Sequence, residues 1–100
     1  MVDDLDATQS RLGPLTIVGA GRAGASLALT LAARPGASAV HLICRNAARR
    51  AELAGHAGHL PLVISSAPTP AAHDVAVVLF ATTDRDLNVA ARQWQATAPR

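Results

Sequence analysis

The chain has 100 residues, half of them hydrophobic, so it can form one small domain with a real core. All nine basic residues are arginine, and the formal net charge is only +2. Apart from a cluster at residues 45–50 the arginines are scattered, which argues against the basic stripe of a general nucleic-acid binder. The single cysteine, Cys44, excludes an internal disulfide and disfavours a zinc site.

Residues 1–13 are polar and acidic without hydrophobic periodicity, and we expect a flexible leader there, before a domain at residues 14–100. They do not resemble a secretory signal, and no apolar run is long enough for a membrane helix. We therefore expect a cytoplasmic protein that binds neither membranes nor nucleic acid.

The first half of the domain alternates strand and helix. The β-branched run at 15–18 ends in Gly19, which predicts a buried strand. Residues 22–33 predict a helix with Leu27 and Leu31 on one face, because leucines four apart share one side. Residues 40–44 predict a second strand, and a helix at 47–54 should follow, capped by Asn46 and ended by Gly55.

The second half continues the alternation. Residues 60–64 predict a weaker strand, and Pro61 places it at the edge of the sheet or at the start of the strand. Residues 65–72 predict a loop in which Pro70 could open one helical turn. The apolar run at 75–80 predicts a strand buried on both faces. A last helix should span 85–96 with Asp84 as N-cap and an apolar stripe of Leu87, Ala91 and Trp94.

This order of elements predicts an α/β fold, namely a Rossmann-type doubly wound parallel sheet. The sheet should be incomplete, with about four strands and flanking helices.

A glycine motif follows the first strand, and it carries the functional prediction. Its residues fit the pattern G-x-G-x-x-G: Gly19, Ala20, Gly21, Arg22, Ala23 and Gly24. In this setting, after a strand and at the start of a helix, the motif is typical of dinucleotide binding. Gly19 permits the tight turn, Gly21 lets a diphosphate approach the backbone, and Gly24 lets helix and strand pack closely. The alternative is a glycine-rich turn that binds no ligand.

The end of the second strand favours NADP(H) over NAD(H). NAD-binding sites place an acidic residue here for the ribose 2′-hydroxyl, whereas this chain has Cys44 and Arg45. Arg45 and Arg49 could bind a 2′-phosphate, with Asn46 adding a hydrogen bond, since guanidinium groups match phosphate in a bidentate way. The alternative is that these arginines form an ordinary solvated helix face.

The glycine motif, the sequence Ile43-Cys44-Arg45-Asn46 and the segment 78–84 together resemble a known group. The chain resembles the N-terminal Rossmann-like domain of DUF2520-type proteins. That group lies within the superfamily of 6-phosphogluconate dehydrogenase-like, pyrroline-5-carboxylate reductase-like and F420-dependent NADP oxidoreductase-like proteins. The resemblance implies cofactor contacts at Ala81 and Thr82, although Thr83 stands where proline is common.

The resemblance also implies a helical domain, absent here, that supplies dimer contacts and catalytic residues. We therefore expect the chain to be an inactive fragment of an oxidoreductase that is a homodimer at full length, and no catalytic residue is assigned. The leading hypothesis is the cofactor-binding portion of an NADP(H)-dependent oxidoreductase. The alternatives are a non-catalytic NADP-binding module and another α/β nucleotide-binding domain, of flavodoxin-like or methyltransferase-like type.

The four histidines and the cysteine are the other candidate site residues. His41 should be a packed, hydrogen-bonded strand residue, and His73 beside Asp74 a structural pair. His56 and His59 lack a third ligand, so we expect a surface loop and no metal. Cys44 should be a small buried residue at a strand end.

Overall fold

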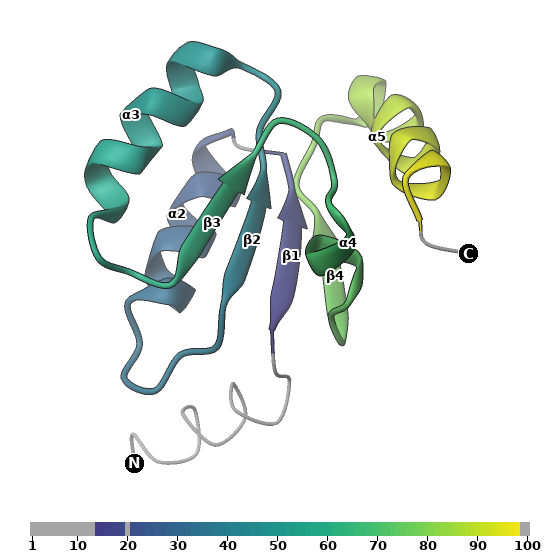
Figure 1. Cartoon of the computed structure of the whole chain (residues 1–100). Helices are drawn as coiled ribbons and strands as arrows, with labels where there is room; N and C mark the ends of the chain where they lie inside the picture. The colour runs from purple at the N-terminus through teal and green to yellow at the C-terminus, as the bar shows by residue number, and fades with distance from the viewer. Residues whose placement is uncertain (1–13, 20, 99–100) are drawn as a thin grey trace.

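The computed structural model describes residues 14–19 and 21–98, without the side chain of Asp84 (Figure 1). The expected leader at residues 1–13 lies outside this part. The strands and helices follow one another along the chain as β1 (Leu15–Val18), α2 (Arg22–Ala32), β2 (Val40–Ile43), α3 (Ala47–Ala57), β3 (Leu62–Ser65), α4 (Pro70–His73), β4 (Val77–Phe80) and α5 (Asp84–Ala96).

The strands form one parallel sheet in the order β3-β2-β1-β4. Leu15 in β1 is in register with Val40 on one side and with Val77 on the other. Helices α2 and α3 cover one face, and α4 lies on the other (Figure 1). The predicted α/β, Rossmann-type sheet is therefore confirmed. The chain adds β2 and β3 on one side of β1 and then crosses over to add β4 on the other side. The strand order therefore reverses at β1, and sheets of this kind bind ligands at such a reversal.

Small residues of α2 make the larger core cluster possible. Gly24, Ala25, Ala28 and Ala32 are buried against the sheet, where Ile17 and Leu42 are fully enclosed. Leu31 is partly buried against this cluster, whereas Leu27, four residues earlier, is 39% exposed. The side of α2 that faces the sheet is made of alanines, because small side chains allow close packing. Leu27 lies on another side of the helix and is directed toward solvent.

The opposite face is closed by α4 and α5. Val18 and Ile43 form a smaller cluster with Ala72 and Ala90, and Trp94 packs against it. The buried hydroxyl of Thr16 donates a hydrogen bond to the carbonyl oxygen of Ala72 at 2.6 Å. This bond anchors α4, the single turn predicted at Pro70, directly on the sheet.

Two helix boundaries differ from the prediction. Helix α3 passes through Gly55 and ends at Gly58, whose φ of +54° is the left-handed conformation that favours glycine at a helix end. The N-cap of α5 is Thr83, so Asp84 is the first helical residue and not the cap.

The predicted burial of the last strand and helix also needs correction. In β4, Leu79 and Phe80 are 39% and 38% exposed, because no described strand pairs with the outer edge of β4. In α5 the buried residue is Ala90, whereas Leu87 is 41% exposed.

Candidate functional site

The turn from β1 into α2 is packed tightly at two of its glycines. Gly19 has φ +109°, and an ideal Cβ there would lie 2.7 Å from the carbonyl oxygen of Ala81. A Cβ on Gly24 would overlap the carbonyl oxygen of Gly19 and lie 3.0 Å from the Cβ of Ala81. The roles predicted for Gly19 and Gly24 in turn and packing therefore have a steric basis, and Ala81 contributes by packing against both positions.

Gly21 differs from these two glycines because it faces open space. It is the N-cap of α2 with φ −67°, and a Cβ there would meet no atom of the described residues within 4 Å. No side chain in the described part of the chain caps the helix, and its first turn contains no acidic residue. Arg22 and Ala23 are exposed in that turn. The amide groups and the positive end of the helix dipole are thus open to an anion. Ala20, also predicted to bind cofactor, lies outside the described residues.

The loop after β2 presents the predicted phosphate ligands. The side-chain oxygen of Asn46 accepts a hydrogen bond from the backbone N–H of Arg49 at 2.9 Å, so Asn46 caps α3 as predicted. The guanidinium of Arg49 donates to Glu52 at 2.9 Å, an exposed pair of small energetic weight. The side chain of Arg45 is exposed and contacts no hydrogen-bond partner in the described part of the chain. Arg45 is therefore a cation available to a ligand.

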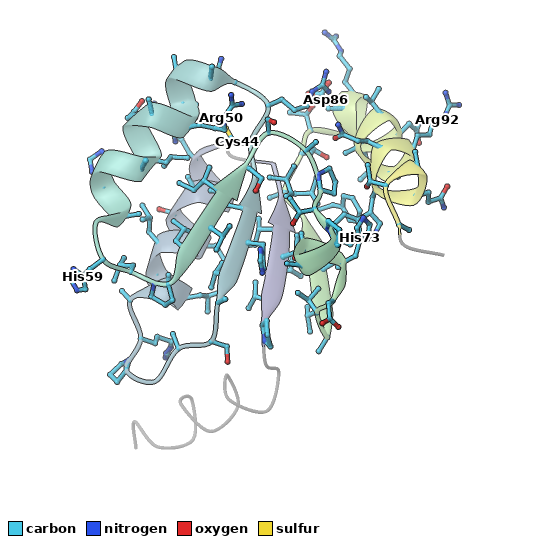
Figure 2. The ribbon with its side chains drawn as sticks, viewed as in Figure 1. Cys44, Arg50, His59, His73, Asp86 and Arg92 are labelled. Atoms are coloured by element: carbon cyan, nitrogen blue, oxygen red, sulfur yellow. The ribbon has the colours of Figure 1, made fainter. Side chains whose placement is uncertain are left out.

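Arg50 has a different role from its two neighbours. Its Nη1 donates hydrogen bonds of 2.9 Å to the carbonyl oxygens of Cys44 and Arg45 (Figure 2). Cys44 is buried at the strand end as predicted, and its Sγ lies 3.6 Å from the carbonyl oxygen of Asn46. Arg50 thus braces the loop that displays Arg45 and Asn46.

A cavity of about 420 Å³ joins these elements at the carboxyl ends of β1 and β2. Its volume falls in the range of small-molecule sites. The wall consists of Val18, Gly19, Ile43, Cys44, Arg45, Asn46, Arg49, Thr82, Asp86, Ala90 and Gln93.

Five of the predicted cofactor residues share this cavity, namely Gly19, Arg45, Asn46, Arg49 and Thr82. Arg22 instead lines a second hollow of about 350 Å³ between α2 and α3, which it shares with Arg49. Gly21, Ala23, Gly24 and Ala81 do not line the first cavity. Gly24 and Ala81 pack against the turn that contains Gly19, and in this way they help to shape the cavity.

Three wall residues from α5 were missed by the sequence reasoning: Asp86, Ala90 and Gln93. Their spacing of four and then three residues is the signal that could have identified them, because it places them on one side of a helix.

Thr82 brings an unsatisfied polar group to the cavity. Its Oγ1 is buried and has no hydrogen-bond partner among the described residues. Its Cγ2 would lie 2.9 Å from a Cβ added at Gly19, so Thr82 packs against the glycine turn. A buried hydroxyl without a partner is destabilising, so a polar ligand group that reached it would be favoured.

The histidines lie away from this cavity. His41 is 7% exposed, and its Nδ1 has no partner within the described segments, so it is packed as predicted but not hydrogen-bonded through that atom. Loss of solvation lowers its pKa. The ring of His73 packs against Trp94 with centroids 3.8 Å apart and the ring planes tilted by 37°, and its Nε2 lies 2.9 Å from Oγ1 of Thr97.

The described residues contain neither a candidate metal site nor a candidate membrane-spanning helix. No three of their His, Cys, Asp and Glu side chains come together as a metal site would require. None of their helices combines the length and apolarity needed to cross a membrane.

Comparison with known proteins gives one match. Residues 14–100 match the family model described as NADP oxidoreductase, coenzyme F420-dependent. The matched segment includes the glycine turn, the arginines after β2 and the segment after β4. Neither the curated proteins nor the solved structures contain a match.

Proposed function

Since the chain belongs to the NADP oxidoreductase, coenzyme F420-dependent family, we propose that it is the cofactor-binding portion of an NADP(H)-dependent oxidoreductase of the DUF2520 type. The observation that carries this proposal is the open backbone at Gly21. It lies at the uncapped start of α2, in the same turn as Gly19, which lines the cavity. This arrangement suits a dinucleotide whose diphosphate sits on the helix end while its adenosine half enters the cavity.

The residues present fit NADP(H) at each of its charged groups. The diphosphate would take hydrogen bonds from the amides that open α2, where a side chain at Gly21 would obstruct it. The 2′-phosphate would be held by Arg45 and Arg49, with the amide nitrogen of Asn46 as a further donor. NADP(H) supplies the hydride when bound, and the protein binds and orients it. The 2′-phosphate assignment favours NADP(H) over NAD(H).

A non-catalytic NADP-binding module is the second candidate. The described wall of the cavity is made mainly of arginine, amide, hydroxyl and apolar side chains, which suit the binding of a cofactor. If the chain is of the DUF2520 type, as proposed, catalysis and homodimer contacts would come from a further helical domain. Hydride transfer by a longer form of the protein would favour the enzyme over the module.

Calorimetric titration of the chain with NADPH, NADH and S-adenosylmethionine tests the proposal. We expect NADPH to bind more tightly than NADH, and S-adenosylmethionine to give no heat. Gly21→Val should abolish NADPH binding without unfolding the protein, because the side chain would extend into the diphosphate position. Gly55→Val is the matched control, since a Cβ at Gly55 also meets nothing within 4 Å but lies on α3.

Two results would contradict the proposal. One is heat with S-adenosylmethionine alone, or with none of the three compounds. The other is an unchanged affinity for NADPH in Gly21→Val.

A further inference from the structure

On the basis of the proposed function, we infer that Asp86 reads the adenine base of the cofactor and makes the site selective for a 6-amino purine. The starting observation is the face that α5 turns to the cavity, which consists of Asp86, Ala90 and Gln93. Ala90 is buried at 8% exposure, Gln93 is half-buried and Asp86 is exposed, so the two polar residues flank one buried apolar residue.

The cavity has different chemistry on its two sides. Arg45 and Arg49 form a cationic wall after β2, and α5 supplies a carboxylate and a carboxamide. Asp86 stands at the end of α5 that is nearest to Cys44 and Arg50 (Figure 2). One molecule spanning the cavity would therefore need an anionic group at one wall and a hydrogen-bond donor at the other.

Asp86 is held in place and retains a free acceptor. Its Oδ2 accepts a hydrogen bond from Oγ1 of Thr83 at 3.1 Å, and its backbone N–H donates to the carbonyl oxygen of Thr83 at 3.0 Å. No described residue donates to Oδ1. The side-chain amide of Gln93 likewise has no partner among the described residues, although its backbone carbonyl accepts from Thr97.

The covalent structure of NADP(H) limits where the base can lie. The same ribose carries the 2′-phosphate, the link to the diphosphate and the base. With the phosphates at Arg45 and at the start of α2, the base must lie within one sugar ring of both, which is in this cavity. Val18, Ile43 and Ala90 give the ring apolar contacts there. The polar edge of the base would then face the residues of α5 that line the cavity.

An ionised carboxylate only accepts hydrogen bonds, so Asp86 favours a base that presents a donor. Adenine presents its 6-amino group. Hypoxanthine presents a carbonyl oxygen at the same position, which would face the carboxylate as one acceptor against another. Asp86 is exposed in the unliganded chain, and a bound base that covered its carboxylate with an acceptor edge would leave both groups without a partner.

The test is calorimetric binding of NADPH and of reduced nicotinamide hypoxanthine dinucleotide phosphate to the full chain. We expect the natural protein to bind NADPH roughly tenfold or more tightly than the analogue, the size of one charge-assisted hydrogen bond. Asp86→Ala should weaken NADPH and leave the analogue nearly unchanged, which removes the preference. Asp86→Asn should shift the preference toward the analogue, because its amide can donate to a carbonyl oxygen.

Asn88→Ala is the matched control, since Asn88 is exposed on the same helix and does not line the cavity. It should leave both affinities unchanged, and thermal unfolding should show that each variant is folded.

Two outcomes would overturn the assignment while leaving the proposed function intact. They are equal binding of NADPH and the analogue by the natural protein, and a preference that survives Asp86→Ala. Failure of the natural protein to bind any pyridine dinucleotide would instead refute the proposed function, and this inference with it.

Discussion

The carbonyl oxygen of Gly19 occupies the space into which a side chain at Gly24 would project. The two residues bracket the turn from β1 into α2, and their contact sets the distance between strand and helix. Gly21, between them in sequence, has no such neighbour. The three glycines of one motif are therefore required for different reasons, two for packing and one for access.

This difference predicts that the same substitution, glycine to alanine, affects stability at Gly24 but not at Gly21. Gly24→Ala should lower the free energy of unfolding by about 1–3 kcal/mol, because the added methyl group meets backbone that cannot move aside. The better helix propensity of alanine, about 1 kcal/mol, offsets only part of this loss. Gly21→Ala should leave the free energy of unfolding nearly unchanged. Urea unfolding of both variants measures the effect, and equal stabilities would show that the turn is looser than the structure indicates.

The arginines after β2 should distinguish the two pyridine cofactors. Arg45→Ala combined with Arg49→Ala should weaken NADPH roughly tenfold to a hundredfold, because hydrogen bonds to charged groups are lost, and should change NADH little. Arg92→Ala is the control, since Arg92 points away from the cavity on the outer side of α5 (Figure 2). Calorimetry with both cofactors makes the comparison. Equal losses for NADPH and NADH would contradict the 2′-phosphate assignment.

His41 should make stability depend on pH. Burial lowers its pKa below the ordinary value of 6.5, so the folded protein keeps the ring neutral while the unfolded chain binds a proton more readily. Its contribution is fully present above the unfolded pKa and is lost as pH falls through 6.5 toward the lower folded pKa. Its neighbours in register, Thr16 and Val63, carry no charge that could stabilise the protonated ring.

Urea unfolding at several pH values between about 7.5 and 5.5 measures this dependence. His41→Leu should flatten the decline in stability over that range. His59→Ala, at an exposed position, should leave the decline as it is. A natural protein whose stability did not change over this range would refute the prediction.

The contact between α4 and α5 depends on a short chain of polar groups. Thr97 Oγ1 donates to the carbonyl oxygen of Gln93 at 2.9 Å, and Nε2 of His73 lies 2.9 Å from the same Oγ1 while its ring packs against Trp94. Thr97→Val keeps the shape and removes the hydroxyl, so it should lower the free energy of unfolding by about 1 kcal/mol. Thr97→Ser should retain most of the stability.

Trp94 is the only tryptophan, so its fluorescence reports this contact directly. The emission of Thr97→Val should show greater exposure of the indole at low urea concentration. If Thr97→Val and Thr97→Ser behave alike, the hydroxyl does not connect the two helices.

Much of the fold could be predicted because its signals are local. The run at 15–18 followed by glycine, and the alanine-rich stretch after Arg22, define a strand and a helix without reference to the rest of the chain. The orientation of each helix could not be predicted in the same way. Leu27 is exposed because alanines permit a closer approach to the sheet, which depends on residues far away in sequence.

The same difference between local signals and long-range packing applies to the residues of the site. Arg45 and Asn46 follow a strand end, so their position in the cavity could be expected from the parallel sheet alone. Asp86 and Gln93 enter the cavity only through the docking of α5, which is governed by contacts such as Ala90 against Val18 and Ile43.

The two hydrogen bonds from Arg50 to the carbonyl oxygens of Cys44 and Arg45 order the backbone at this site before a ligand binds. They fix the backbone beside the cavity as part of folding itself, so that segment loses its conformational freedom before any ligand arrives. An incoming molecule then meets a surface already in its final shape, and less of the interaction energy is spent on ordering protein. Arg50 can in this way increase the affinity of the site for a ligand that it does not contact itself.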